Sequence, residues 1–300
     1  MYRSILININ KALSLLLLFF TLFSCQEIDL DESEIISNSI MESPKSWLDT
    51  LCSRTFEGRK VGTQGNKRAA LFLYNEVKKM GYAPEIQKFA HSSGDTLRNV
   101  IIQKKGVNDS LIIIGAHFDG QHASNNKVHY EAANDNASGV VTLLSILDSI
   151  ARVDLKYSIM AVFFDGEESC VPPAFKGSSY FVNNLNEKEK VVLYINIDAM
   201  GHNHDNQMIL GWFGSHRVLK VVDRLKKEKK FNYSIKERIK GEGASDYKSF
   251  SLVGIPYISY TDISLSCDYP QHDVRDSREA VNLSRLLKVR DLSIEICNCI

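Results

Sequence analysis

Five side chains of the types that bind divalent metals occur in order along this chain, and an acidic neighbour adjoins the third. The five are His117, Asp135, Glu168, Asp198 and His272. Imidazole nitrogens and carboxylate oxygens without a thiolate suit zinc, cobalt or manganese in a hydrolytic site. Glu167, directly before Glu168, offers the free carboxylate that metal-assisted hydrolysis needs as a base. The pattern therefore predicts a metallohydrolase.

The elements that must position these groups are apolar runs that predict buried strands. Three such runs are Leu111–Ala116, Tyr157–Phe164 and Val191–Ile197. Polar groups follow each run at once: His117, then Asp165 to Glu168, then Asp198. In open α/β sheets, ligands bind in the crevice at the carboxyl ends of the strands. We therefore expect these groups to meet at one edge of a sheet, where cations would offset the cost of burying several carboxylates.

The remaining periodicity predicts strands that alternate with helices. Further strands are expected at Asn99–Gln103 and Tyr257–Tyr260. Helices are expected at Thr63–Met80, Ser138–Ala151, Ser178–Asn184, His216–Glu228 and Glu279–Ile296. This alternation predicts an α/β fold, a three-layer αβα sandwich around a mixed, mostly parallel central sheet. We expect one domain over residues 41–300, since neither an internal repeat nor an interdomain linker is evident in the sequence.

The charge balance narrows the choice of partners. The chain has 300 residues, with 36 basic and 36 acidic side chains and a formal net charge of zero. Such a balance gives no reason to expect nucleic acid or an anionic membrane surface as a partner. It leaves the oligomeric state open.

The first 25 residues have the pattern of a secretory signal. Arg3 and Lys11 precede a short apolar segment, Ala12–Phe20, that is brief for a bilayer span. Leu22-Phe23-Ser24-Cys25 resembles the lipobox of bacterial lipoproteins, in which the cysteine is acylated and becomes the N-terminus. By the sorting rule that this resemblance implies, Gln26 favours the outer membrane, and residues 26–40 form a polar tether. A plain cleavable signal is the alternative.

Export makes disulfides possible. Cys170 follows Glu168 by two residues and Cys267 precedes His272 by five, so a shared metal site would bring the two sulfurs near each other. A Cys170–Cys267 disulfide is therefore one hypothesis. Buried free cysteines are the favoured alternative.

Taken together, the motifs resemble one known family. They are Ala116–Asp119, Asn134–Gly139, Phe164–Glu168, Asn196–Asp198, and His272 with Asp276. As an ordered set they are similar to the zinc aminopeptidases that include the bacterial leucine aminopeptidases, whose fold is shared with animal-type glutaminyl cyclases. The resemblance extends from about Leu51 to the C-terminus.

The resemblance implies a metal centre of two Zn²⁺ ions in residues 41–300. Asp135 would bridge the ions, with one carboxylate oxygen on each. His117 and Asp198 would complete one ion, and Glu168 and His272 the other. Two such metals can activate a shared water and stabilise a developing oxyanion.

The remaining acids are expected to have other roles. The resemblance implies that Glu167 would be the general base and not a metal ligand. Asp119 would orient the imidazole of His117 from outside the ligand set, and Asp276 would support the loop that carries His272. The substrate would be a peptide, whose ammonium group Glu167 and Glu242 could hold.

Three departures from the family pattern concern the substrate pocket. They are Ser245-Asp246-Tyr247 where Ser-Asp-His is common, Asn134 where a second aspartate is frequent, and the segment Ser169–Phe175. They leave every expected ligand in place and put specificity in question.

Several functions therefore stay open. An exported aminopeptidase is preferred to a glutaminyl-peptide cyclotransferase with a single zinc, because the cyclases typically have Asp-Ser-Ala where this chain has Asp135-Asn136-Ala137. A binding domain without catalysis is disfavoured by the complete ligand set. A carboxypeptidase or another amide hydrolase is a further alternative.

Other polar residues are expected to have ordinary roles. The solvated loop histidines would be His122, His129, His202, His204 and His216. Ser138 is expected to start a helix and not to act as a nucleophile. Asp165 could orient a ligand or cap its strand, and Gly241–Gly243 would form a flexible pocket loop.

Overall fold

The computed structural model describes the chain from residue 43 onward, apart from several short segments. Those segments are 170–174, 203–206, 214–219, 222, 225–226, 228–233, 238–244 and 262–270. The expected signal peptide, Cys25, the polar tether and the Cys170–Cys267 disulfide lie outside the described residues. Met41–Ile300 form one compact unit.

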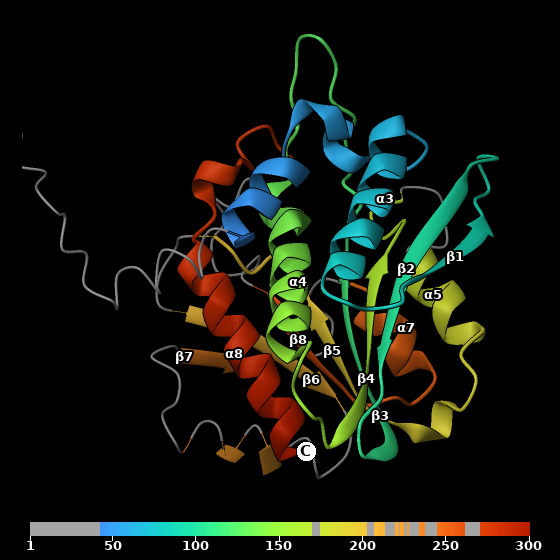
Figure 1. Ribbon diagram of the computed structural model, residues 1–300. Helices are drawn as coiled ribbons and strands as arrows, with labels where there is room; N and C mark the ends of the chain where they lie inside the picture. The colour runs from blue at the N-terminus through green and yellow to red at the C-terminus, as the bar shows by residue number, and fades with distance from the viewer. Residues whose placement is uncertain are drawn as a thin grey trace, which may run out of the picture. The chain divides into compact units, whose positions relative to one another are not determined.

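A mixed sheet forms the centre of this unit (Figure 1). Its strands are β1 (Glu85–Ala90), β2 (Thr96–Lys104), β3 (Asn108–His117), β4 (Tyr157–Phe164), β5 (Val191–Ile197), β6 (Gln207–Phe213), β7 (Ser234–Glu237) and β8 (Tyr257–Thr261). Among the described residues these eight lie in the order β1-β2-β4-β3-β5-β8-β6-β7. The central strands β4, β3, β5 and β8 run parallel, and β1, β2 and β6 pair antiparallel with neighbours.

Helices cover both faces of the sheet, which confirms the three-layer αβα prediction. One face carries a helix at residues 43–51 together with α3 (Gln64–Lys79), α4 (Ser138–Ile150) and α8 (Leu283–Cys299). The other face carries α5 (Lys176–Asn183) and α7 (Tyr247–Leu252) (Figure 1). Short helical turns lie at η1 (Arg54–Arg59), η2 (Ala133–Ala137), η3 (Lys188–Lys190) and η5 (Arg278–Ala280).

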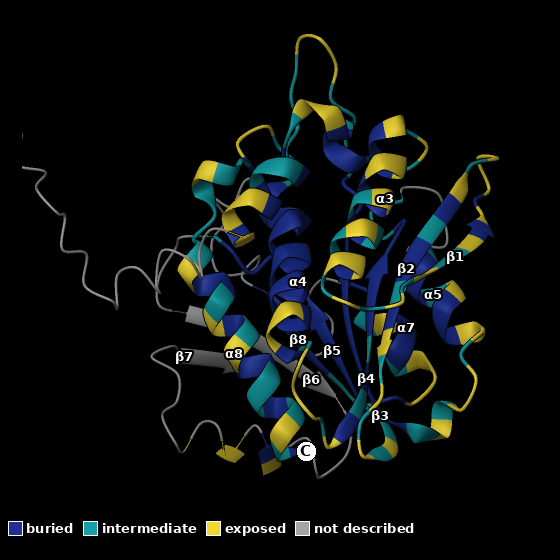
Figure 2. Cartoon of the chain, viewed as in Figure 1, coloured by how far each residue is buried: buried dark blue, intermediate teal, exposed yellow. Residues whose placement is uncertain are grey.

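The alternation of side chains along β3 separates two apolar cores. Ile112 and Ile114 face the core under α4 and α8, whereas Leu111 and Ile113 face the core under α5 and α7. Successive strand residues point to opposite faces, so a strand that is apolar throughout must be covered on both. Figure 2 shows the resulting buried interior, with the central strands and α4 in dark blue.

The predicted elements match closely where the sequence signal is local. The Thr63 hydroxyl caps α3 by accepting from the Asn66 N–H, where the sequence predicted a helix start. The last helix begins at Leu283 and not at Glu279, because η5 precedes it and the Asn282 side chain caps its first turn. Of the helix expected at His216–Glu228, the described residues Lys220, Val221, Asp223, Arg224 and Lys227 are helical.

Among the described strands and α-helices, five were not predicted: the helix at residues 43–51, β1, β6, β7 and α7. In β1 only Phe89 is buried, so this edge strand has no apolar run to reveal it. Among the described residues, no helix combines the length and apolar character that a bilayer span requires.

The side chain of Arg59 stabilises the loop between β3 and η2 by hydrogen bonds to its backbone. Its guanidinium is fully buried and donates to four backbone carbonyls, those of Leu51, Phe118, Glu131 and Ala132, at 2.7 to 2.9 Å. Burial lowers the pKa of this guanidinium, and nearby acids including Asp276, Asp119 and Asp135 oppose that shift. The four hydrogen bonds offset the cost of burying the charge. They also fix the path of residues 118–132 between two of the candidate ligands.

Candidate metal centre

Asp135 lies between two histidines that come from distant parts of the chain. Its Oδ1 is 3.4 Å from Nε2 of His117, and its Oδ2 is 3.3 Å from Nε2 of His272. The two carboxylate oxygens therefore face different histidines. This is the arrangement that a carboxylate bridging two metal ions needs.

Each histidine also faces a second carboxylate. Nε2 of His117 is 3.4 Å from Oδ1 of Asp198, and Nε2 of His272 is 2.7 Å from Oε1 of Glu168. The strand ends bring these groups together, since His117 ends β3, Asp198 follows β5 and Glu168 follows β4. All five sequence-predicted ligands thus meet at one place.

The position of Glu167 permits two roles. Candidate ligand atoms of His117, Glu167 and Asp198 lie within 4.8 Å of one another, as do those of Asp135, Glu168 and His272. The first group could hold an ion with Glu167 as a ligand. Alternatively, Glu167 could stand beside an ion that His117, Asp135 and Asp198 hold, which is the role the sequence predicted.

Asp119 holds the two glutamates through their backbone. Its Oδ1 accepts from the Glu167 N–H at 3.1 Å, and its Oδ2 accepts from the Glu168 N–H at 3.0 Å. Nδ1 of His117 lies 3.2 Å from the Asp119 carbonyl oxygen and 3.7 Å from its carboxylate. The contact with the imidazole is thus closest at the main chain. The fully buried carboxylate of Asp119 mainly positions Glu167 and Glu168.

Asp276 holds the backbone at Asp135, as Asp119 holds the backbone at Glu167 and Glu168. Its two carboxylate oxygens accept from the N–H groups of Asn134 and Asp135, at 2.7 and 3.1 Å. Its own N–H donates to the carbonyl of Asp273 at 3.1 Å, next to His272. Asp276 therefore supports the bridging aspartate directly, besides closing the turn that carries His272. Burial raises the pKa of Asp276 to about 7.

Two buried asparagines join the Asp135 loop to the Asp198 loop. The Asn136 side chain donates to the Ile197 carbonyl at 3.0 Å and accepts from the Ala199 N–H at 3.1 Å. Oδ1 of Asn134 accepts from the Gly201 N–H at 2.5 Å. The Asp135–Asn136 peptide bond is cis. Asn134, which departs from the family pattern, is fully buried, and its side chain links the two loops by a hydrogen bond.

The centre concentrates negative charge that divalent cations would neutralise. Burial opposes ionisation of Asp135, yet hydrogen bonds from His117 and His272 keep its pKa below its usual range. Burial and the neighbouring Asp135 raise the pKa of Glu168 to about 7. Burial lowers the pKa of His272, but its bonds to Asp135 and Glu168 dominate and raise it to about 10. Buried carboxylates beside imidazoles form a donor set that fits zinc.

Asp246 is an acid of this region whose place the sequence did not predict. It is 1% exposed, and neither carboxylate oxygen has a hydrogen-bond partner among the described residues. Burial raises its pKa to about 7, and its charge acts on Glu167 and Tyr194. The only sequence signal was the departure Ser245-Asp246-Tyr247 from the family pattern.

The remaining candidates have structural roles. Oγ of the fully buried Ser138 donates to the Asn134 carbonyl and accepts from the Met200 N–H, so this residue fastens a loop. Asp165 is buried and accepts from the Asn66 side chain and the Arg98 N–H. His129 is half-buried and not solvated as expected, since Nε2 lies 2.8 Å from the Cys52 carbonyl.

The other loop histidines divide between described and undescribed residues. The His122 ring packs on Tyr130 at 4.8 Å, and His202 forms an isolated bridge with Val281. His204, His216, Glu242 and the loop Gly241–Gly243 lie outside the described residues.

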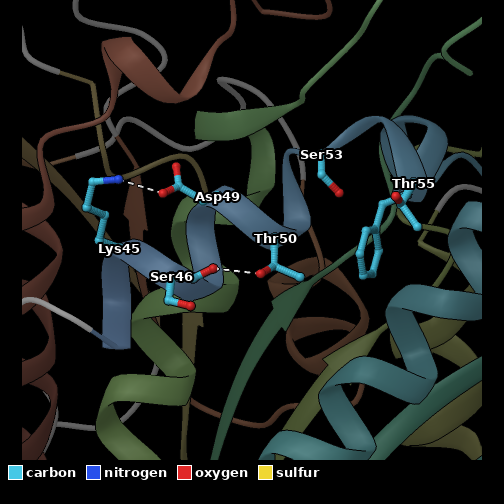
Figure 3. A pocket seen from close by; sticks show the side chains of 7 residues that line it. Lys45, Ser46, Asp49, Thr50, Ser53 and Thr55 are labelled. Carbon is cyan, nitrogen blue, oxygen red and sulfur yellow. Dashed lines mark hydrogen bonds and ion pairs between the residues drawn. The ribbon is translucent and has the colours of Figure 1, made fainter.

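A separate hollow lies on the helix at residues 43–51 and on η1 (Figure 3). Within it, Lys45 pairs with Asp49 at 2.6 Å and the Thr50 hydroxyl donates to the Ser46 carbonyl. The ion pair is largely exposed, and such pairs contribute little to stability or binding. None of the residues that line this hollow belongs to the metal centre.

Comparison with known proteins places the chain in a family. The model of the family described as Peptidase family M28 matches residues 99–297, which is more than half of the chain. This protein therefore belongs to peptidase family M28.

Individual relatives agree with this membership. A probable leucine aminopeptidase 2 of Aspergillus fumigatus is 26% identical over 256 residues, which cover 76% of this chain and 49% of that protein. The chain thus spans about half the length of that relative. A zinc aminopeptidase from Bacillus subtilis shares the fold, with a TM-score of 0.73, 15% identity and coverage of 86% of this chain and 94% of that one. The fold is also that of Porphyromonas gingivalis glutaminyl cyclase, with a TM-score of 0.68, 21% identity and coverage of 86% and 97%.

Proposed function

We propose that this protein is a zinc-dependent aminopeptidase that hydrolyses the N-terminal peptide bond of peptides. The observation that carries the proposal is Asp135, whose two oxygens face His117 and His272 in separate groups that also contain Asp198 and Glu168. Membership of peptidase family M28 supports the reaction class. The similarity to a probable leucine aminopeptidase supports the choice of exopeptidase.

The side chains fit two zinc ions and divide the work between binding and proton transfer. His117, Asp135 and Asp198 would hold one ion, and Asp135, Glu168 and His272 the other. Zinc, when bound, acts as a Lewis acid and lowers the pKa of water. Glu167 takes a proton from the attacking water and delivers it to the leaving amine.

The environment of Glu167 suits a proton carrier. Burial raises the pKa of its carboxyl well above the ordinary value, and the charges of Glu168, Asp198 and Asp246 add to that shift. Nearby cations would lower this pKa again and so favour the carboxylate form that a general base needs. Asp119 keeps the carboxylate in place by holding the Glu167 N–H.

The alternative function is a glutaminyl-peptide cyclotransferase that uses a single zinc. The likeness to a glutaminyl cyclase supports the shared fold. The presence of complete donor sets around both oxygens of Asp135 favours the hydrolase.

An assay of the chain from residue 26 onward distinguishes these functions. We expect release of p-nitroaniline from at least one of a panel of aminoacyl-p-nitroanilides, abolished by a chelator and restored by Zn²⁺. An N-terminal glutaminyl peptide should lose its first residue and should not cyclise. Formation of a pyroglutamyl product without anilide cleavage would refute the aminopeptidase and support the cyclase.

We further propose that the chain is an exported lipoprotein anchored through Cys25, with residues 26–40 as its tether. The basis is the signal-like N-terminal sequence that ends in Leu22-Phe23-Ser24-Cys25. In a bacterial host, a clickable palmitate analogue should label the wild-type chain and should not label Cys25→Ser. Labelled chain should fractionate with the outer membrane. Equal labelling of both proteins would contradict the assignment.

A further inference from the structure

The turn between β1 and β2 contains a histidine that is buried although it lies in a loop. His91 is 7% exposed. The turn is closed by the His91 N–H, which donates to the Asp95 carbonyl at 2.8 Å, and by the Gly94 N–H, which donates to the His91 carbonyl at 3.0 Å. A loop imidazole removed from water in this way needs polar partners inside the protein.

The partners of His91 link the turn to the residue after the two glutamates. Nε2 of His91 lies 2.8 Å from Oγ of Ser169, and Nδ1 lies 2.6 Å from Oγ of Ser93. The Ser93 hydroxyl donates to Oδ2 of Asp95 at 2.6 Å. Either neutral tautomer keeps the bond between His91 and Ser169 and only reverses its direction. Burial and the charge of Lys176 lower the pKa of His91, which disfavours the charged imidazolium.

The hairpin of β1 and β2 also holds the start of the segment 165–169, which contains Glu167 and Glu168. The Arg98 N–H donates to Oδ2 of Asp165 at 2.9 Å, and the Asp165 N–H donates to Oδ1 of Asn99 at 3.1 Å. Residues 165–169 are thus fastened by β2 at one end and by His91 at the other. Asp119 holds the two amides between these ends.

We propose that His91 is a positioning residue for Glu167 and Glu168, acting through its hydrogen bond to Ser169. Without this bond, the far end of the segment loses one of its fixed points, directly beside Glu168. Displacements of a few tenths of an ångström in a ligand or a base are enough to weaken metal binding and catalysis. The effect on catalysis rests on the proposed aminopeptidase function, whereas the effect on the metal does not.

Three substitutions of His91 distinguish a positioning role from packing alone. A glutamine amide reaches the place of the imidazole Nε2, whereas an asparagine amide reaches only that of Nδ1. We expect His91→Ala and His91→Asn to weaken the affinity for the zinc ion that Asp135, Glu168 and His272 would hold. The loss should be about tenfold or more, as is usual when the residues that support metal ligands are removed. Both substitutions should lower kcat by a similar factor with little change in KM. His91→Gln should restore most of both.

Two further variants complete the design. Ser169→Ala should match His91→Ala in zinc affinity and kcat, and the double variant should be no worse than either, since both substitutions remove the same bond between His91 and Ser169. Tyr180→Ala is the control for packing, because Tyr180 stacks on Phe89 of β1 with ring centroids 4.6 Å apart. It should lower the melting temperature without changing zinc affinity.

Zinc affinity is measured in the full-length protein by competition with a chromogenic chelator, alongside kcat, KM and the melting temperature. Equal losses in His91→Gln and His91→Ala would overturn the proposal. So would a His91→Ala protein that is only less thermostable, with wild-type zinc affinity and kcat. If the wild type cleaves no anilide but zinc affinity follows the expected order, the positioning role stands and the proposed function fails.

Discussion

Replacement of Glu167 with glutamine is expected to lower kcat by about 10²–10⁴-fold while both zinc ions remain bound. Glutamine has the size of glutamate but cannot take a proton from water. Its N–H still donates to Asp119, which leaves the neighbouring Glu168 in place. Zinc content by elemental analysis and kcat on the best anilide substrate would be measured on the same preparation.

The matched control is the same substitution one residue along the chain. Glu168→Gln removes a carboxylate that lies 2.7 Å from His272 and should release zinc together with activity. The two substitutions therefore distinguish a general base at Glu167 from a metal ligand at Glu168. If Glu167→Gln also lost one zinc, Glu167 would be a ligand in the group with His117 and Asp198, as their mutual spacing within 4.8 Å allows.

Replacement of Asp135 with alanine is expected to release both zinc ions and to reduce activity below detection. Each oxygen of this carboxylate faces a different histidine, so its loss leaves two incomplete pairs: His117 with Asp198 and His272 with Glu168. Structural and catalytic zinc sites generally require at least three protein ligands. Zinc bound after dialysis against a weak chelator would be counted.

The comparison variant is His117→Ala, which removes one side chain from one group only. It should release one equivalent of zinc and keep the other, which Asp135, Glu168 and His272 hold. Retention of one tightly bound zinc by Asp135→Ala would show that Asp135 does not bridge. Unchanged stoichiometry in His117→Ala would refute its role as a ligand. Circular dichroism of both variants checks that Met41–Ile300 remain folded.

The sequence was informative wherever the determining interactions are local. The positions of His117, Glu168 and Asp198 at or just beyond strand ends were predictable, because an apolar run followed by a polar residue marks the place where a buried strand leaves the sheet. The start of α3 and the bounds of β4 and β5 followed from neighbouring residues in the same way. Edge strand β1 was missed because only one of its six residues is buried.

The supporting contacts were beyond sequence reasoning, since they join residues far apart in the chain. Asp119 holds amides 48 and 49 residues away, and Asp276 holds amides 142 and 141 residues away. His91 and Ser169 are separated by 78 residues. A single sequence shows that such side chains are polar. It does not show their partners, because these depend on which distant segments the fold brings together.

The sequence by itself thus determined the family resemblance, the kind of sheet and the identity of the candidate ligands, because ligand chemistry resides in side-chain type and strand position. The tertiary structure alone decided which oxygen of Asp135 faces which histidine, that Asp119 and Asp276 hold backbone amides, and that Asp246 is buried. The physical reason is that distance and burial arise only when the parallel strands bring their carboxyl ends to one edge.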